Sequence, residues 1–242
     1  MVGPKAPAKT EKGEMVEERS SRAEIDAFLK QVRTLKPAGA GRGRLIFAMD
    51  ATMSRQPSWD LALELQADMF NAVKAVGGLD VQLVYFRGFN ECQASKWVGD
   101  TEALARLMRK VNCEGGFTQI RKVLAHAKRE SAACKVNALV YVGDCMEENV
   151  DELAQLAGEL GLIGVPVFIF HEGREPRAEL AFREIARLSR GAYCPFDAGS
   201  ARQLRELLTA VAVYATGGRK ALKDFTSETK SVGATRLLEQ LR

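Results

Sequence analysis

Residues 44–54 read RLIFAMDATMS. Residues 44–50 are a short, mainly apolar run of strand length. Asp50, Thr52 and Ser54 then follow at every second position. In an extended or turning segment this spacing directs all three side-chain oxygens to one side. We therefore predict a buried strand that ends in a loop carrying oxygen ligands.

Strand-like and helix-like segments alternate after this run, which indicates an α/β sheet with crossover helices. Strands expected at 79–86 and 91–98 are close enough to form a hairpin, so one strand is expected to be antiparallel. The run 136–143 (VNALVYVG) is apolar nearly throughout, as in a strand buried on both faces. Further strands are expected at 165–170 and 192–196, and helices at 57–76, 100–111, 118–133, 149–160, 177–190 and 200–215.

The chain has 242 residues, 46% of them apolar, which is enough for one substantial core. Residues 1–20 are densely charged without apolar periodicity, which predicts a disordered arm. Residues 21–43 read as an amphipathic helix followed by a Gly/Pro/Ala linker. The globular body is expected over 44–216, and a polar tail with one possible short helix over 217–242.

The net charge of +4 is unevenly distributed. Residues 1–44 hold 10 basic and 6 acidic residues, and residues 218–242 hold 6 and 3. The body between them holds 19 basic and 22 acidic residues. Nucleic-acid binding uses Lys and Arg clustered on a folded face, so we expect no specific nucleic-acid binding.

The 5 cysteines are widely spaced and include no C-x-x-C pair, which favours free thiols in a reducing compartment. The first 20 residues lack the apolar segment of a secretory signal. No uninterrupted apolar run approaches the roughly 18 residues of a membrane span. We therefore expect a cytoplasmic protein without a membrane span.

Two further loops supply oxygen atoms. The Gly-rich stretch 114–118 (EGGFT) ends in Thr118, and the apolar strand 136–143 is followed by Asp144. In an open α/β sheet, ligands bind beyond the carboxyl ends of the strands where strand order reverses. Oxygen-only ligands suit a hard cation, with Mg²⁺ first and Mn²⁺ or Ca²⁺ next. The predicted metal site therefore consists of Asp50, Thr52, Ser54, Thr118 and Asp144.

The order of these five residues resembles the metal ion-dependent adhesion site (MIDAS) of the von Willebrand factor A (VWA) family. That site uses an Asp-x-Ser/Thr-x-Ser triplet, a distant Thr and a distant Asp. The resemblance implies an open, mostly parallel, six-stranded, Rossmann-like sheet. It also implies helices on both faces, one antiparallel edge strand, and adjacent first and fourth strands at the metal. One departure is that Cys145 follows Asp144, where the family usually has Gly.

By this resemblance Thr52, Ser54 and Thr118 would contact the ion, while Asp50 and Asp144 would hold its waters and hydroxyls. The family completes the coordination with an acidic side chain of a partner protein. The resemblance thus implies a cation-dependent adaptor, not an enzyme. Bacterial members often accompany AAA+ ATPases, so such an ATPase system is an expected partner.

Two alternatives remain open. A Mg²⁺-dependent phosphoryl-transfer or hydrolase enzyme could use the same crevice. Against it, Thr52 stands where haloacid dehalogenase-type phosphatases have a second Asp, and only His126 and His171 are available as histidine bases. The other alternative is a structural interaction domain with a vestigial metal site.

Several residues near the predicted site have simpler interpretations. Glu147 and Glu148 are assigned to the dipole of the helix that starts at Asn149. Phe117 either packs over the site or fills the core. His126 is expected at the surface and Cys145 as a buried, inert thiol.

Overall fold

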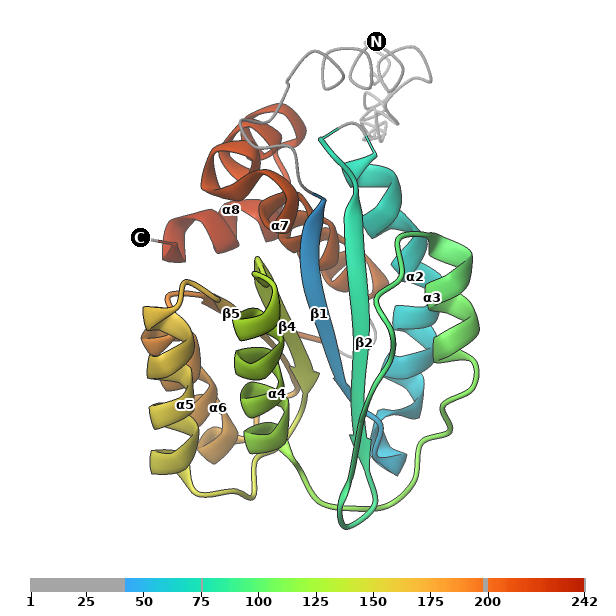
Figure 1. The fold of residues 1–242 in the computed structure, drawn as a ribbon, viewed down its shortest axis with the longest axis vertical. Helices are drawn as coiled ribbons and strands as arrows, with labels where there is room; N and C mark the ends of the chain where they lie inside the picture. Colours follow the sequence, from blue (N-terminus) through green and yellow to red (C-terminus); the bar gives the residue numbers. More distant parts are fainter. Residues whose placement is uncertain (1–41, 75, 198–199, 242) are drawn as a thin grey trace, which may run out of the picture.

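The computed structural model describes residues 42–74, 76–197 and 200–241. These residues form a six-stranded sheet in the order β3-β2-β1-β4-β5-β6 (Figure 1). Among the described strands, only β3 is antiparallel to its neighbour, β2. The expected open, mostly parallel sheet with an antiparallel edge strand is confirmed. The strands are β1 (Gly43–Asp50), β2 (Leu79–Arg87), β3 (Glu91–Ala94), β4 (Ala138–Gly143), β5 (Val167–Glu172) and β6 (Ala192–Phe196).

Strand order reverses between β1 and β4. These two strands pair in parallel, with Leu45 opposite Ala138 and Met49 opposite Val142. From β1 the chain continues outward to β2 and β3, whereas from β4 it continues in the other direction to β5 and β6. The carboxyl ends of β1 and β4 therefore lie side by side at the bottom of Figure 1, where α/β sheets bind their ligands.

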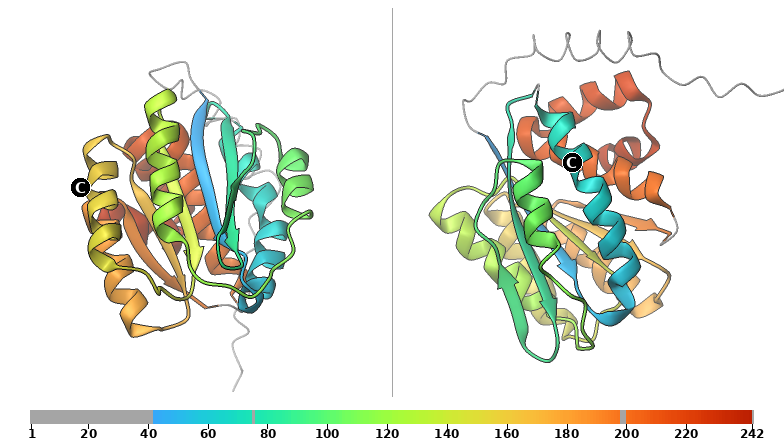
Figure 2. Two further views of the ribbon diagram at one scale, coloured as in Figure 1. Left: turned by 60° about the horizontal axis from the view of Figure 1, so that its bottom comes forward. Right: turned by 90° about the vertical axis from the view of Figure 1, so that its right-hand side faces the viewer.

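Helices cover both faces of the sheet (Figures 1 and 2). Alternate residues of β1 point to opposite faces: Leu45, Phe47 and Met49 belong to one core cluster, and Ile46 and Ala48 to the other. The first cluster includes α2 (Gln56–Val73), α3 (Thr101–Met108), α7 (Ala201–Thr229) and α8 (Val232–Gln240). The second includes α4 (Ile120–Ala133), α5 (Val150–Leu162) and α6 (Pro176–Leu188). A short 3₁₀ helix, η1 (Met53–Arg55), precedes α2.

The C-terminal part is more helical than the sequence pattern predicts. The helix expected to end at residue 215 continues as α7 to Thr229, with a kink at Gly218, whose φ is 68°. Beyond the kink, α7 buries Leu222 and packs the partly buried Phe225 against the same core. Two apolar side chains three residues apart are a weak helix signal in a polar stretch. The sequence pattern alone therefore predicted a tail beyond residue 216.

None of the described helices combines the length and apolar character that crossing a bilayer requires.

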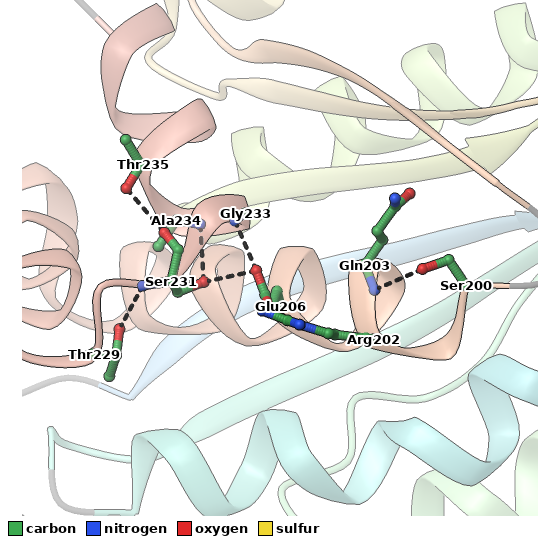
Figure 3. A network of polar contacts seen from close by, with 9 residues as sticks. All are labelled: Ser200, Arg202, Gln203, Glu206, Thr229, Ser231, Gly233, Ala234 and Thr235. Atoms are coloured by element: carbon green, nitrogen blue, oxygen red, sulfur yellow. Dashed lines mark hydrogen bonds and ion pairs between the residues drawn. The ribbon is translucent and has the colours of Figure 1, made fainter. Parts of the chain in front are cut away.

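Glu206 of α7 caps the start of α8 (Figure 3). Its Oε2 accepts hydrogen bonds from the Gly233 backbone N–H at 2.9 Å and from the Ser231 hydroxyl at 3.2 Å. Its other oxygen, Oε1, pairs with Arg202 at 3.0 Å. Because the first amides of a helix have no partner within the helix, this side chain ties α8 to α7.

The side-chain amide of Gln240 in α8 pairs with the outer edge of β6. Its Oε1 accepts from the Tyr193 N–H at 2.9 Å, and its Nε2 donates to the Tyr193 carbonyl at 3.0 Å. An uncovered sheet edge exposes unpaired backbone groups that can pair with other chains. The C-terminal helix therefore protects part of this edge.

We predict that Glu206→Ala lowers the free energy of unfolding by about 1–3 kcal/mol, because the Gly233 amide loses its acceptor. Urea denaturation followed by circular dichroism measures this loss. The control Glu102→Ala removes an exposed i,i+4 pair with Arg106 and should change stability by less than about 0.5 kcal/mol. Equal losses in the two variants would contradict the capping role of Glu206.

Candidate functional site

Asp50 ends β1 and is 1% exposed. Its Oδ1 accepts a hydrogen bond from the Thr52 N–H at 2.7 Å, which shapes the turn after the strand. Its Oδ2 is buried and has no hydrogen-bond partner among the described residues. Buried polar atoms normally have a partner, so this oxygen calls for a ligand.

Burial raises the pKa of Asp50 from its ordinary value of 3.8 to about 6. The hydrogen bonds from Thr52 lower this pKa, the nearby Asp144 raises it and the guanidinium of Arg55 lowers it. The net shift is upward because removal from water destabilises the ionised form of Asp50 more than Thr52 and Arg55 stabilise it. A cation next to Asp50 would offset that cost.

Asp144 directly follows β4 and faces Asp50. Its Oδ2 lies 3.0 Å from the guanidinium of Arg55, while its Oδ1 is buried without a hydrogen-bond partner in the described part of the chain. A carboxylate oxygen of Asp50, one of Asp144 and the Sγ of Cys145 lie within 4.8 Å of one another. The two neighbouring strands thus bring two incompletely bonded carboxylates together.

The three predicted hydroxyl ligands lie in the loop after β1 and in the segment before α4. Thr52 Oγ1 and Ser54 Oγ are 3.4 Å apart in the loop after β1. Thr118 Oγ1 accepts from the Glu147 N–H at 3.1 Å, and the Thr118 N–H donates to Glu147 Oε2 at 3.1 Å. Thr118 is therefore joined to the loop that carries Asp144, while Thr52 and Ser54 share the loop of Asp50.

The assignment of Glu147 and Glu148 to the following helix is wrong. Glu147 binds the Thr118 backbone, as above, and Glu148 accepts from the N–H groups of Ile120 and Arg121 at the start of α4. The reason is that Gln119, at the N-cap of α4, makes no side-chain cap, so the first amides of that helix need an acceptor. Asn149 caps α5 instead.

Arg55 is a site residue that the sequence analysis missed. Its Nη2 atom pairs with Asp144 Oδ2 at 3.0 Å, and its Nη1 atom lies 2.6 Å from Glu172 Oε2 at the end of β5. The hydroxyl of Ser58 also donates to Glu172. The Arg55 side chain is 13% exposed, so the structure places a partly buried positive charge beside Asp144. Its position directly after Ser54 was visible in the sequence, but the direction of its side chain was not.

Cys145 is partly buried. Burial, together with the charge of Asp144, raises the pKa of its thiol to about 12. At neutral pH the sulfur is therefore protonated, and a thiol binds metals poorly compared with a thiolate. Oxygen atoms dominate the chemistry of this site.

The two histidines occupy defined positions in the fold. His171 is fully buried, with Nε2 3.0 Å from the Asp144 carbonyl and Nδ1 2.8 Å from the Tyr193 hydroxyl. A carbonyl only accepts, so Nε2 donates and Nδ1 accepts from Tyr193. His171 thereby fixes the backbone of Asp144. The expectation of a surface His126 is corrected: it is partly buried, with Nε2 2.8 Å from Gln82 Oε1.

The residues fit a hard divalent cation. When ionised, the three carboxylates of Asp50, Asp144 and Glu172 face one positive charge, from Arg55, which leaves excess negative charge in a buried place. Within the described residues, one buried oxygen of each aspartate has no hydrogen-bond partner, and the loop of Asp50 also carries the hydroxyls of Thr52 and Ser54. An ion held here would offset the negative charge and present positive charge to a ligand.

Comparisons with known proteins identify the fold of this chain. No family model matches the chain, and no curated protein matches it. Among solved structures, an aerotolerance-related membrane protein from Bacteroides fragilis has 16% identity and a TM-score of 0.54, with 71% of this chain and 98% of that chain covered. The SpRpn10 VWA domain has 13% identity and a TM-score of 0.57, with 71% and 95% covered.

A third similar structure is proximal thread matrix protein 1 from the mussel byssus, with a zinc-occupied MIDAS motif. It has 16% identity and a TM-score of 0.52, with 72% of this chain and 45% of that chain covered. At such identities the similarity establishes the fold alone. The chain has the VWA fold, which confirms the resemblance found in the sequence.

We predict that Asp50→Asn stabilises the metal-free protein in a pH-dependent way. The folded chain holds the Asp50 proton more tightly than the unfolded chain, so its stability falls as pH rises from about 4 to 6. Asn keeps an acceptor for the Thr52 N–H and cannot ionise. The variant should therefore be more stable than the natural chain by up to about 3 kcal/mol at neutral pH. Urea denaturation in EDTA at several pH values measures the difference. A difference that stays constant with pH would contradict the raised pKa.

We predict that Arg55→Gln strengthens Mg²⁺ binding by about tenfold or more, because it removes a positive charge next to Asp144. Calorimetric titration measures the affinity. Arg106→Gln, which removes an exposed charge from α3, is the matched control and should leave the affinity unchanged. Weaker binding in Arg55→Gln would instead mean that Arg55 supports the ion site.

Proposed function

We propose that this chain is a protein-interaction module that binds a divalent cation beyond the carboxyl ends of β1 and β4. The ion would then bind an acidic side chain of a partner. Its proposed ligands, direct or through water, are Asp50, Thr52, Ser54, Thr118 and Asp144. The observation that carries this proposal is the pair of buried, unpartnered carboxylate oxygens on Asp50 and Asp144.

Mg²⁺ is the proposed ion, with Mn²⁺ or Ca²⁺ as substitutes. The donor atoms are carboxylate and hydroxyl oxygens, which hard cations prefer. A partner's carboxylate would complete the coordination and bring negative charge to the ion.

We favour binding over catalysis because the free oxygens of Asp50 and Asp144 are assigned to the ion, and the other ionisable side chains around the site already have partners. Both ring nitrogens of His171 are hydrogen-bonded, and Glu147 and Glu148 accept from backbone amides. Glu172 pairs with Arg55. General-base catalysis needs a side chain that is free to accept a proton, and these groups are not free. We therefore propose a binding role without enzymatic activity.

The partner is proposed to be a protein with an exposed acidic residue. An AAA+ ATPase system, a bacterial origin and a cytoplasmic location are proposed on the sequence resemblance and composition alone. The acidic ligand rests on the chemistry of the site. It is therefore the part of the proposal that direct binding experiments address first.

One observation favours a second candidate, a structural interaction domain without a metal. Arg55 already offsets part of the negative charge of Asp144, with its guanidinium at 3.0 Å. In this alternative the ion pair replaces the metal, and the partner binds elsewhere on the surface. The two candidates differ in whether the protein responds to divalent cations.

Calorimetric titration of Mg²⁺, Mn²⁺ and Ca²⁺ tests the proposal. We expect saturable binding to the natural chain and weakening by about tenfold or more in Thr118→Ala, because one oxygen ligand is lost. Thr229→Ala is the control, since that hydroxyl bonds only within α7 and the turn that follows. Absence of binding for all three ions would support the metal-free alternative.

A further inference from the structure

Two phenylalanine side chains are exposed side by side near the candidate site. Phe89 lies in the turn between β2 and β3 and is 81% exposed, and Phe117 lies in the loop before α4 and is 53% exposed. Their ring centroids are 5.5 Å apart in an edge-to-face arrangement. Exposed aromatic pairs of this kind are costly in water and are typical of interaction surfaces.

The two loops are fixed to each other by their backbones. The Phe117 N–H donates to the Gly88 carbonyl at 3.0 Å, and a side chain at Gly116 would clash with the Gly88 backbone. Gly88 itself has a φ of 58°, which favours glycine. Lys122 holds the same turn by donating to the Asn90 carbonyl at 2.9 Å. The ring pair is therefore preorganised, which reduces the entropy cost of binding a ligand.

The ring pair adjoins the proposed ion ligands. Phe117 directly precedes Thr118, and the Glu114 N–H in the same loop donates to the Ala51 carbonyl, next to Asp50, at 3.0 Å. In Figure 1 the β2–β3 turn and the loop from α3 to α4 meet at the edge where β1 ends. One ligand can therefore reach the ion and the rings together.

The surroundings of the rings favour an apolar contact over an ionic one. Arg87, at the end of β2, is already paired with Glu91 at 3.0 Å and with Glu114 at 2.8 Å. The body of the chain is also more acidic than basic, which disfavours bases of single-stranded nucleic acid as the stacking partners. A peptide that brings its own apolar side chain fits these charges better.

We propose that Phe89 and Phe117 form the apolar half of the partner-binding surface. The inference rests on the proposed function, because the ion supplies the other half. The partner is a peptide segment with an acidic side chain for the ion and a large apolar side chain, such as Leu, for the rings. Because neighbouring residues are about 3.8 Å apart and Phe117 adjoins Thr118, the apolar side chain lies one to three residues from the acidic one.

Fluorescence anisotropy with labelled peptides tests this surface. The probes are serine peptides with one central Asp and one Leu placed one, two or three residues to either side. Peptides without Leu, or with Asn in place of Asp, are the controls. In millimolar Mg²⁺, we expect at least one Leu position to bind about tenfold or more tightly than the peptide without Leu. EDTA or the Asn peptide should abolish binding.

In the variants Phe89→Ser and Phe117→Ser, the Leu peptide should bind no more tightly than the peptide without Leu. The affinity of both variants for Mg²⁺ alone should stay unchanged. Leu180→Ser, which removes a 72% exposed leucine from α6, is the matched control and should keep the advantage. Circular dichroism checks that each variant is folded. Because Phe89 is mostly exposed, its replacement should leave the core intact.

The possible failures are distinct. Mg²⁺-dependent peptide binding without any preference for Leu would overturn the role of the rings and leave the proposed ion function intact. Absence of Mg²⁺ binding in calorimetry would overturn both. A protein that binds Mg²⁺ but no peptide, or that binds oligothymidine in preference to the peptides, would also overturn the inference about the partner.

Discussion

Two carboxylates that lie side by side at the point of strand reversal, each with one buried oxygen, are the constraint on which this structure depends. Asp50 ends β1 and Asp144 follows the neighbouring parallel strand β4; Asp50 is buried, whereas the Asp144 side chain is 24% exposed. Each keeps one buried oxygen without a hydrogen-bond partner in the described chain. Burial, opposed by the hydrogen bonds from Thr52, raises the pKa of Asp50 to about 6, so its charged form is unfavourable there without a cation. The loops around the site accommodate this constraint.

The neighbouring polar groups are arranged so that they leave those two oxygens available. Arg55 takes one oxygen of Asp144 and pairs with Glu172. His171 holds the Asp144 carbonyl, and Glu147 holds the backbone of Thr118. The site is thus rigid and partly neutralised, but it remains short of positive charge. The contacts of Arg55, His171 and Glu147 thus support the loops that carry Asp144 and Thr118.

The sequence predicted those features that depend on local pattern. The apolar runs 44–50 and 136–143 predicted two buried strands, which the family resemblance implied to be neighbours. The alternate spacing of Asp50, Thr52 and Ser54 predicted a shared loop. The features it missed depend on contacts between distant residues. Glu148 caps α4 because Gln119 does not, Arg55 points to Asp144 through the turn of η1, and the helix beyond Gly218 is stabilised by packing of Leu222. None of these contacts leaves a periodic signal in the chain.

The most direct test of the account is the anomalous diffraction of Mn²⁺ in crystals of the chain grown with that ion. We predict one strong peak between Asp50 and Asp144, with hydroxyl oxygens of Thr52, Ser54 or Thr118 among the ligands of the ion. Mn²⁺ is suited to this measurement because it takes the oxygen ligands that Mg²⁺ takes and scatters anomalously. A map without a peak there, with Arg55 still paired to Asp144, would contradict the central claim.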